Sequence, residues 1–151
     1  MAEDHPWAAL AGTWRGTGHG EYPTITAFDY VEELTILPVP GRPVAHWRST
    51  TRDAASGEPR HAESGFLRAN AEWVELVVAH SFGIVEASSG SFDSALLDVR
   101  STGMLGTASA KQVDEVARRY HLDGDSLEYE IAMAAVGLPM THHLKAELRR
   151  D

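Results

Sequence analysis

Cysteine is entirely absent from this chain of 151 residues. Its absence excludes disulfide bonds, a catalytic thiolate, iron–sulfur clusters and thiolate-bound zinc, because each of them needs a cysteine sulfur. It also leaves the redox state of the compartment unmarked. Any chemistry must therefore come from histidine, carboxylate or hydroxyl side chains, or from a bound cofactor.

Long apolar runs and an excess of basic residues are also missing. The longest stretch without charged or strongly polar residues covers residues 131–140, which falls short of the roughly 18 apolar residues of a membrane-spanning helix. Glu3 and Asp4 stand where a signal peptide carries Lys or Arg. The net charge of −9 repels nucleic-acid phosphates. We therefore expect a cytoplasmic protein that binds neither membranes nor nucleic acid.

Turn residues divide the chain into short stretches with the period-2 alternation of β-strands. In residues 73–80, for example, Val74, Leu76, Val78 and His80 share one face. A short helix over residues 7–11, after Pro6 and ended by Gly12, is the only helix expected. The predicted strands cover residues 31–37, 45–51, 64–68, 73–80, 83–87, 95–102, 113–122, 127–134 and 141–150, after a first strand within residues 12–24.

Four glycines mark expected turns: Gly41, Gly57, Gly90 and Gly124, the last within an Asp-Gly-Asp hairpin signal. Short strands without crossover helices indicate an antiparallel sheet, and closure of that sheet removes its edges. A β-sandwich is the structural alternative. We predict a single all-β domain, residues 1–151, folded as an antiparallel up-and-down β-barrel of about ten strands with a short N-terminal helix, a size that can hold a ligand.

Residues 12–20 contain four of the 13 glycines of the chain. A nucleotide-binding glycine loop needs a helix directly after it, and Tyr22-Pro23 opens no helix. We therefore interpret the segment as a first barrel strand, in which glycines allow sharp curvature and the close approach of a neighbour or a flat ligand.

The histidines and acidic pairs suggest no site on their own. Adjacent strand residues face opposite sides, so alternation predicts that His142 points inward with Leu144 and that His143 faces water. His61 is expected to be exposed, and His80 to be a core histidine with a backbone partner. No His-x-His or His-x-x-x-His spacing supports a zinc site. There is no Gly-x-Ser-x-Gly segment for a hydrolase. The pair Glu32-Glu33 is interpreted as a strand edge, and Asp123 and Asp125 as a turn.

Four blocks of the sequence resemble the nitrobindins, a family of haem-binding ten-stranded β-barrels. A lone Gly-x-Trp also occurs in lipocalins, but the four blocks together, in this order, are specific. The blocks are Gly12-Thr13-Trp14-Arg15-Gly16-Thr17-Gly18 with Tyr22-Pro23-Thr24, Phe28-Asp29-Tyr30-Val31-Glu32-Glu33, His61-Ala62-Glu63-Ser64-Gly65-Phe66-Leu67-Arg68 and Pro139-Met140-Thr141-His142-His143-Leu144-Lys145-Ala146.

The resemblance implies haem b as the cofactor and His143, which directly precedes Leu144, as the ligand of its iron. It places His61 on the distal side, Thr24 near the haem and Lys111 beside a propionate. This contradicts the alternation argument, but a β-bulge can turn a nominally outward residue inward. The choice between His142 and His143 remains open from the residues alone.

The implied activity is isomerisation of peroxynitrite to nitrate at ferric haem, with reversible binding of nitric oxide. No catalytic side chain is implied, because the chemistry takes place at the iron. The alternative function is a non-haem carrier of a small apolar ligand, lined by Leu127, Tyr129, Ile131 and Met133. We expect a monomer or a weak homodimer.

Overall fold

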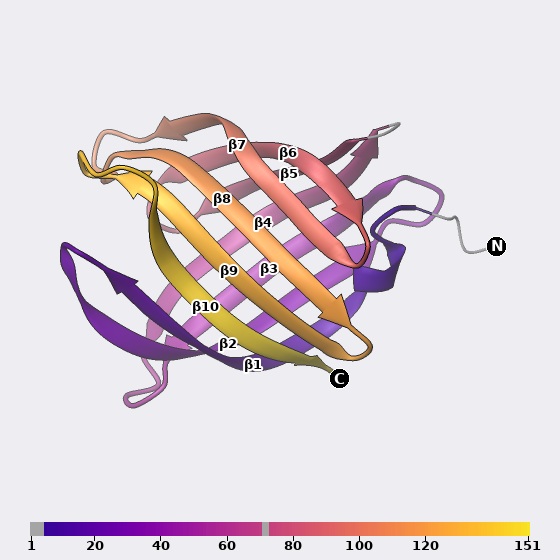
Figure 1. Cartoon of the computed structure of the whole chain (residues 1–151), viewed down its shortest axis with the longest axis horizontal. Coiled ribbons are helices and arrows are strands. Elements are labelled where there is room, and N and C mark those ends of the chain that lie inside the picture. Colours follow the sequence, from indigo (N-terminus) through magenta and orange to yellow (C-terminus); the bar gives the residue numbers. More distant parts are fainter. Residues whose placement is uncertain (1–4, 71–72) are drawn as a thin grey trace.

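Ten antiparallel strands form a closed barrel in the computed structural model, which describes residues 5–70 and 73–151 (Figure 1). Each strand pairs with its neighbours in the sequence, and β1 closes the barrel against β10. This confirms the predicted fold class. The elements are a short 3-10 helix, η1 (Ala8–Leu10), and β1 (Gly12–Tyr22), β2 (Ile25–Pro38), β3 (Val44–Asp53), β4 (Pro59–Asn70), β5 (Trp73–His80), β6 (Ile84–Asp93), β7 (Leu96–Gly106), β8 (Val113–Asp123), β9 (Ser126–Ala135) and β10 (Thr141–Arg150).

The turns at Gly41, Gly57 and Gly124 are confirmed, each with a positive φ, but the turn expected at Gly90 is wrong. Gly90 lies inside β6, where an added Cβ would come within 1.9 Å of the carbonyl oxygen of Asp98 on β7. Glycine is therefore required there by the close approach of two strands. The actual turn is formed by Ser94 and Ala95, with φ values of 51° and 63°, the positive pair that a type I′ hairpin turn needs.

The glycines of β1 are explained by neighbouring aromatic rings. A Cβ on Gly18 would lie 2.2 Å from the ring of Tyr30, and one on Gly20 would lie 2.2 Å from the ring of Phe28. Both rings come from β2, the hairpin partner of β1. The sequence predicted that these glycines allow sharp curvature and the close approach of a neighbour or a flat ligand. At Gly18 and Gly20 the structure shows the close approach of a neighbour.

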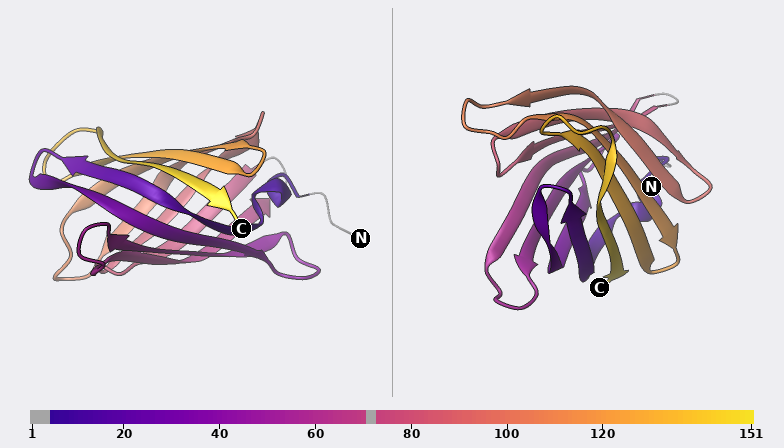
Figure 2. Two further views of the ribbon diagram at one scale, coloured as in Figure 1. Left: turned by 90° about the horizontal axis from the view of Figure 1, so that it is seen from below. Right: turned by 60° about the vertical axis from the view of Figure 1, so that its left-hand side comes forward.

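One end of the barrel is filled by apolar side chains, and η1 lies at this end, as the left view of Figure 2 shows. Trp7 and Leu10 are fully buried there. The indole Nε1 of Trp14 donates a hydrogen bond of 2.9 Å to the carbonyl oxygen of Leu10, and the guanidinium of Arg150 lies 4.3 Å from the centre of the Trp14 ring. We call this end of the molecule the closed end.

At the opposite end the wall of the barrel is less complete. The ladder between β7 and β8 runs only from the pair Leu96–His121 to the pair Arg100–Ala117. Beyond it, the backbone N–H of Val116 donates to the hydroxyl of Ser101 at 2.9 Å, in place of a backbone partner.

Helices long and apolar enough to span a membrane are absent from the described residues.

Candidate functional site

A cavity of about 600 Å³ occupies the barrel at the end away from η1, within the usual size range of small-molecule and cofactor sites. Residues of four connections line its mouth, so we call this end the open end: Thr24 between β1 and β2, Phe82 between β5 and β6, Lys111 between β7 and β8, and Val136 between β9 and β10. Apolar walls come from Ile25, Phe28, Ile84, Met104, Ile131, Met133 and Leu144.

His143 is a bulged residue that reaches into this cavity. The ladder between β10 and β9 pairs His142 with Ala132 and then Leu144 with Ile131, so His143 is the extra residue of a β-bulge. His142 is exposed, whereas His143 is half-buried and lines the cavity. The inward orientation predicted for His142 by alternation is therefore wrong, because a bulge shifts the facing of the residues that precede it.

The imidazole of His143 is oriented by the backbone of the neighbouring strand. Its Nδ1 donates to the carbonyl oxygen of Glu21 at 3.0 Å, just beyond the last pair of the β1–β10 ladder, Gly20–Leu144. Burial lowers the pKa of His143, although the bond to Glu21 opposes this shift. The ring is therefore neutral at pH 7, and its Nε2 keeps a lone pair for a ligand.

Tyr22 holds this arrangement together from the end of β1. Its hydroxyl donates to the carbonyl oxygen of Met133 at 3.1 Å and accepts from the N–H of Ala135 at 3.1 Å. Its ring meets that of His143 edge-on, with the centres 5.6 Å apart. The contacts tie the β1–β2 hairpin to β9 and limit rotation of the His143 ring.

The other residues expected at the site also line the cavity. Thr24 and Lys111 lie exposed at its mouth. His61, on β4, is half-buried and packs against Phe82, with the ring centres 4.6 Å apart. The sequence-based expectation of an exposed His61 is thus only partly met. His61 and His143 both line the cavity, and His61 is among the neighbours that lower the pKa of His143.

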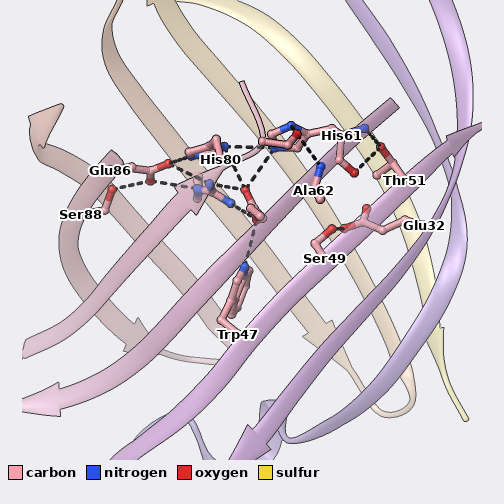
Figure 3. A network of polar contacts seen from close by, with 12 residues as sticks. Glu32, Trp47, Ser49, Thr51, His61, Ala62, His80, Glu86 and Ser88 are labelled. Atoms are coloured by element: carbon pink, nitrogen blue, oxygen red, sulfur yellow. Dashed lines mark hydrogen bonds and ion pairs between the residues drawn. The ribbon is translucent and has the colours of Figure 1, made fainter. Parts of the chain in front are cut away.

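Deeper in the barrel lies a buried ionic cluster, in which the guanidinium of Arg118 binds two carboxylates. Figure 3 shows two of its members, Glu86 and His80. Arg118 donates to both oxygens of Glu63, at 2.9 and 2.8 Å, and to both oxygens of Glu86, at 3.0 and 2.8 Å. His80 joins the cluster through its Nε2, 2.9 Å from Glu86. The side chain of Arg118 is therefore fully paired despite its burial, as a buried charge requires.

The charges of this cluster hold its carboxylates ionised. Burial, the largest single influence, would favour the neutral acid, but the charge and hydrogen bonds of Arg118 together with His61 and His80 outweigh it, so the pKa of Glu63 lies well below its usual range. The same balance, with help from the hydrogen bond of His80, lowers the pKa of Glu86 to about 2. In return the two carboxylates raise the pKa of Arg118 in spite of its burial.

Glu32 behaves differently from these two carboxylates. It accepts hydrogen bonds from the hydroxyl of Ser49, at 2.6 Å, and from that of Tyr129, which in turn bonds Tyr30. Burial raises the pKa of Glu32 to about 7, because these hydroxyls compensate it only in part. Its interpretation as a strand edge is wrong: Glu32 points inward, and only its neighbour Glu33 is exposed.

The ionic cluster and the role of His80 were not predicted from the sequence. His80 bonds side chains, Glu86 and His61, rather than the expected backbone partner. A signal did exist, because Arg118 stands at an inward position of β8, between Val116 and Tyr120. Charged residues at inward positions of several strands indicate a paired internal network.

Comparisons with known proteins agree in the kind of protein they find. The family model described as "THAP4-like, heme-binding beta-barrel domain" matches residues 4–150. The peroxynitrite isomerase of Nocardia farcinica (strain IFM 10152) is 47% identical over 149 residues, which cover 95% of this chain and 88% of that protein. Peroxynitrite isomerase 1 of Mycolicibacterium paratuberculosis is also 47% identical, over 95% of this chain and 92% of that protein.

A solved structure gives the same result at the level of the fold. The crystal structure of Rv2717c from M. tuberculosis superposes with a TM-score of 0.87 at 38% sequence identity. The match covers 95% of this chain and 93% of that one. The barrel is thus similar to an experimentally determined structure over almost its whole length.

Proposed function

The chain belongs to the family of THAP4-like haem-binding β-barrels, the nitrobindins, and on that premise we propose that it binds haem b in the cavity and isomerises peroxynitrite to nitrate, with nitric oxide as a further ligand. Haem is the cofactor of the family. The observation that carries the proposal for this chain is the bulged His143, whose Nδ1 is bound to Glu21.

The residues of the cavity fit a haem group. An imidazole nitrogen is a common axial ligand of haem iron, and a histidine ligand usually donates its other N–H to a backbone carbonyl or a carboxylate, which fixes the tautomer. His143 has such an arrangement. Apolar walls from Ile131, Met133 and Leu144 suit a porphyrin ring, and the cation of Lys111 at the mouth suits a propionate.

Each remaining residue has a definable task. His143 would hold the iron through Nε2, with Glu21 and Tyr22 fixing its ring. His61 would act on the distal side without ligating the iron, and Thr24 would lie near the haem. Ferric haem, when bound, would supply the iron chemistry that converts peroxynitrite to nitrate. This reaction needs no general base from the protein. Because the net charge of −9 repels the peroxynitrite anion at long range, any electrostatic attraction must come from residues near the cavity.

The function is tested by reconstituting the protein with haemin and measuring peroxynitrite decay together with the nitrate yield. We expect the decay rate to rise in proportion to the haem-loaded protein, and nitrate to account for the product. His61→Ala should retain haem yet alter the rate, because distal groups act on the bound ligand. Decay equal to that of free haemin would contradict the proposed activity.

The alternative of a non-haem carrier has no specific support, because the matched family binds haem. We further propose that residues 1–151 form one domain, that the protein is cytoplasmic and monomeric or weakly dimeric, and that it binds neither nucleic acid nor membranes. The acidic net charge supports the exclusion of nucleic acid. Sedimentation at several concentrations, and a DNA-column assay at physiological salt, test these points.

A further inference from the structure

We propose that His61, Glu63 and His80 form a second metal site, independent of His143, for a divalent transition-metal ion of the zinc class. The three residues lie on β4 and β5 at the wall of the cavity. Figure 3 shows the rings of His61 and His80 side by side. Their ligand atoms converge: His61 Nε2 lies 3.0 Å from His80 Nδ1, and Glu63 Oε2 lies 3.7 and 3.5 Å from these two nitrogens.

The register of two strands creates this triangle. Glu63 and His80 are directly opposite each other in the β4–β5 ladder, and His61 precedes Glu63 by two residues, which places it on the same face. Ligands about 2.0–2.2 Å from a tetrahedral zinc ion lie about 3.3 Å from one another. The three separations are close to that value without any rearrangement of the backbone.

The surroundings of the histidines prepare them as ligands. The carboxylate of Glu86 can only accept, so the Nε2 of His80 donates to it at 2.9 Å, and Nδ1 of the neutral ring carries the lone pair. Such a carboxylate–histidine pair is the usual support of a metal-bound histidine. The Nε2 of His61, 3.0 Å from this lone pair, can carry a proton that it donates to His80, and a metal ion can take the place of that proton between the two nitrogens.

The charges favour a divalent ion over a single proton. Glu32, Glu63 and Glu86 are buried, and Arg118 is the buried cation paired with the last two. Two ionised carboxylates face the single charge of Arg118, so Glu63 and Glu86 leave one negative charge in excess even when Glu32 is protonated, and an uncompensated buried charge is costly. A carboxylate offers about four lone-pair directions. Arg118 and the indole of Trp47 donate three hydrogen bonds to Glu63, of which only one reaches Oε2, so Oε2 can still bind an ion.

The donor set defines the class of ion. Two imidazoles and one carboxylate suit zinc and its neighbours in the transition series, whereas magnesium and calcium prefer oxygen ligands alone. Three protein ligands leave one position of a tetrahedral ion for water or a small anion. His61 and His80 are not fully buried, so the ion can enter through the cavity.

The test is calorimetric titration of Zn²⁺ into protein stripped with EDTA, both without haem and after haem loading. We expect one zinc ion per chain in both forms, and at least tenfold weaker binding by His61→Gln and by His80→Gln. The matched control is His19→Gln, which removes an exposed histidine that pairs with Asp29, and it should bind zinc like the wild type. Mg²⁺ should give no binding.

A spectroscopic readout supplements the calorimetry, with far-UV circular dichroism to verify folding of each variant. Co²⁺ added to the haem-free protein should give the intense visible bands of tetrahedral coordination, and His80→Gln should lose them. Absence of zinc uptake, or equal uptake by His80→Gln and the wild type, would overturn the proposal and leave a shared proton between the two rings. Haem binding is tested separately through His143, so the two proposals can fail independently.

Discussion

The closed and open ends of the barrel are built from the same ten strands but from different kinds of residue. At the closed end, Trp7, Leu10 and Trp14 pack with the buried leucines of the strands under η1. At the open end, Arg118 and its carboxylates occupy the interior, and the cavity separates the strands. Apolar burial stabilises the first end, whereas the second places costly buried charges around a ligand site.

The backbone differs in the same way. Within residues 5–70 and 73–151, register shifts occur between Gly20 and Tyr22, Thr51 and Arg52, Ala87 and Ser88, Val113 and Glu115, and His142 and Leu144. All of them fall in the halves of the strands nearer the open end. Regular ladders therefore accompany the apolar core, and the irregular ones re-aim side chains such as His143 toward the cavity.

The largest expected loss of unfolding free energy is at the closed end. Trp14→Ala removes a fully buried indole and should lower the free energy of unfolding by about 3–5 kcal/mol. Urea denaturation of the haem-free protein measures this loss. Phe82→Ala, at the mouth, where the ring is 60% exposed, is the control and should change it by less than about 0.5 kcal/mol. An equal loss of unfolding free energy in the two variants would contradict the view that apolar burial stabilises mainly the closed end.

The next effect concerns the ionic cluster of the open end. Arg118→Met leaves Glu63 and Glu86 buried without their partner and should cost about 3 kcal/mol in urea denaturation. Adding Glu63→Gln and Glu86→Gln to the same chain should restore most of that stability, because the two carboxylates that Arg118 neutralised then carry no charge. If the triple variant is as unstable as the single one, the cost arises from packing and not from charge.

A smaller effect should appear as a pH dependence. The pKa of Glu32 is raised to about 7 from an ordinary value of 4.5, so its stabilising contribution is present below pH 4.5 and is lost as the pH rises through 7. Glu32→Gln imitates the neutral acid. We expect it to match the wild type near pH 5 and to exceed it by about 1–3 kcal/mol at pH 8. Parallel stability curves over this range would contradict the assignment.

The smallest effect lies in a turn of the closed end. Ala95 has a φ of 63°, a left-handed conformation that is unfavourable for residues with a Cβ. Ala95→Gly should relieve this strain and raise the unfolding free energy by about 0.5 kcal/mol, the remainder being offset by the entropy of glycine. A thermal melt of the two proteins is sufficient, and a clear loss of stability would show that the Ala95 methyl packs favourably.

Much of the fold was predictable from alternation and turn residues. The boundaries of β5 and β10 were predicted, as was the inward face of Leu127, Tyr129 and Ile131. The turn predicted at Gly90 was wrong because, in the sequence, a glycine needed for the close approach of two strands cannot be distinguished from one needed for a turn. The turn at Ser94 and Ala95 contains no glycine, so composition did not reveal it.

The site was predictable only in part, since period-2 alternation assumes a regular ladder. That assumption placed His142 inside, and the bulge at His143 reverses it. The resemblance to the nitrobindins identified residues that the structure finds around one cavity. The pairing of His61 with His80 depends on the register of β4 against β5, which no local spacing encodes.

The central claim is that His143 alone among the protein's side chains binds the haem iron, and side-by-side haemin titration of His143→Ala, His142→Ala and the wild type tests it most directly. The account predicts that His143→Ala loses the Soret shift and most of the haem affinity. His142→Ala should leave both nearly intact, because His142 points out of the cavity. Equal binding by His143→Ala and the wild type, or loss only in His142→Ala, would contradict the claim.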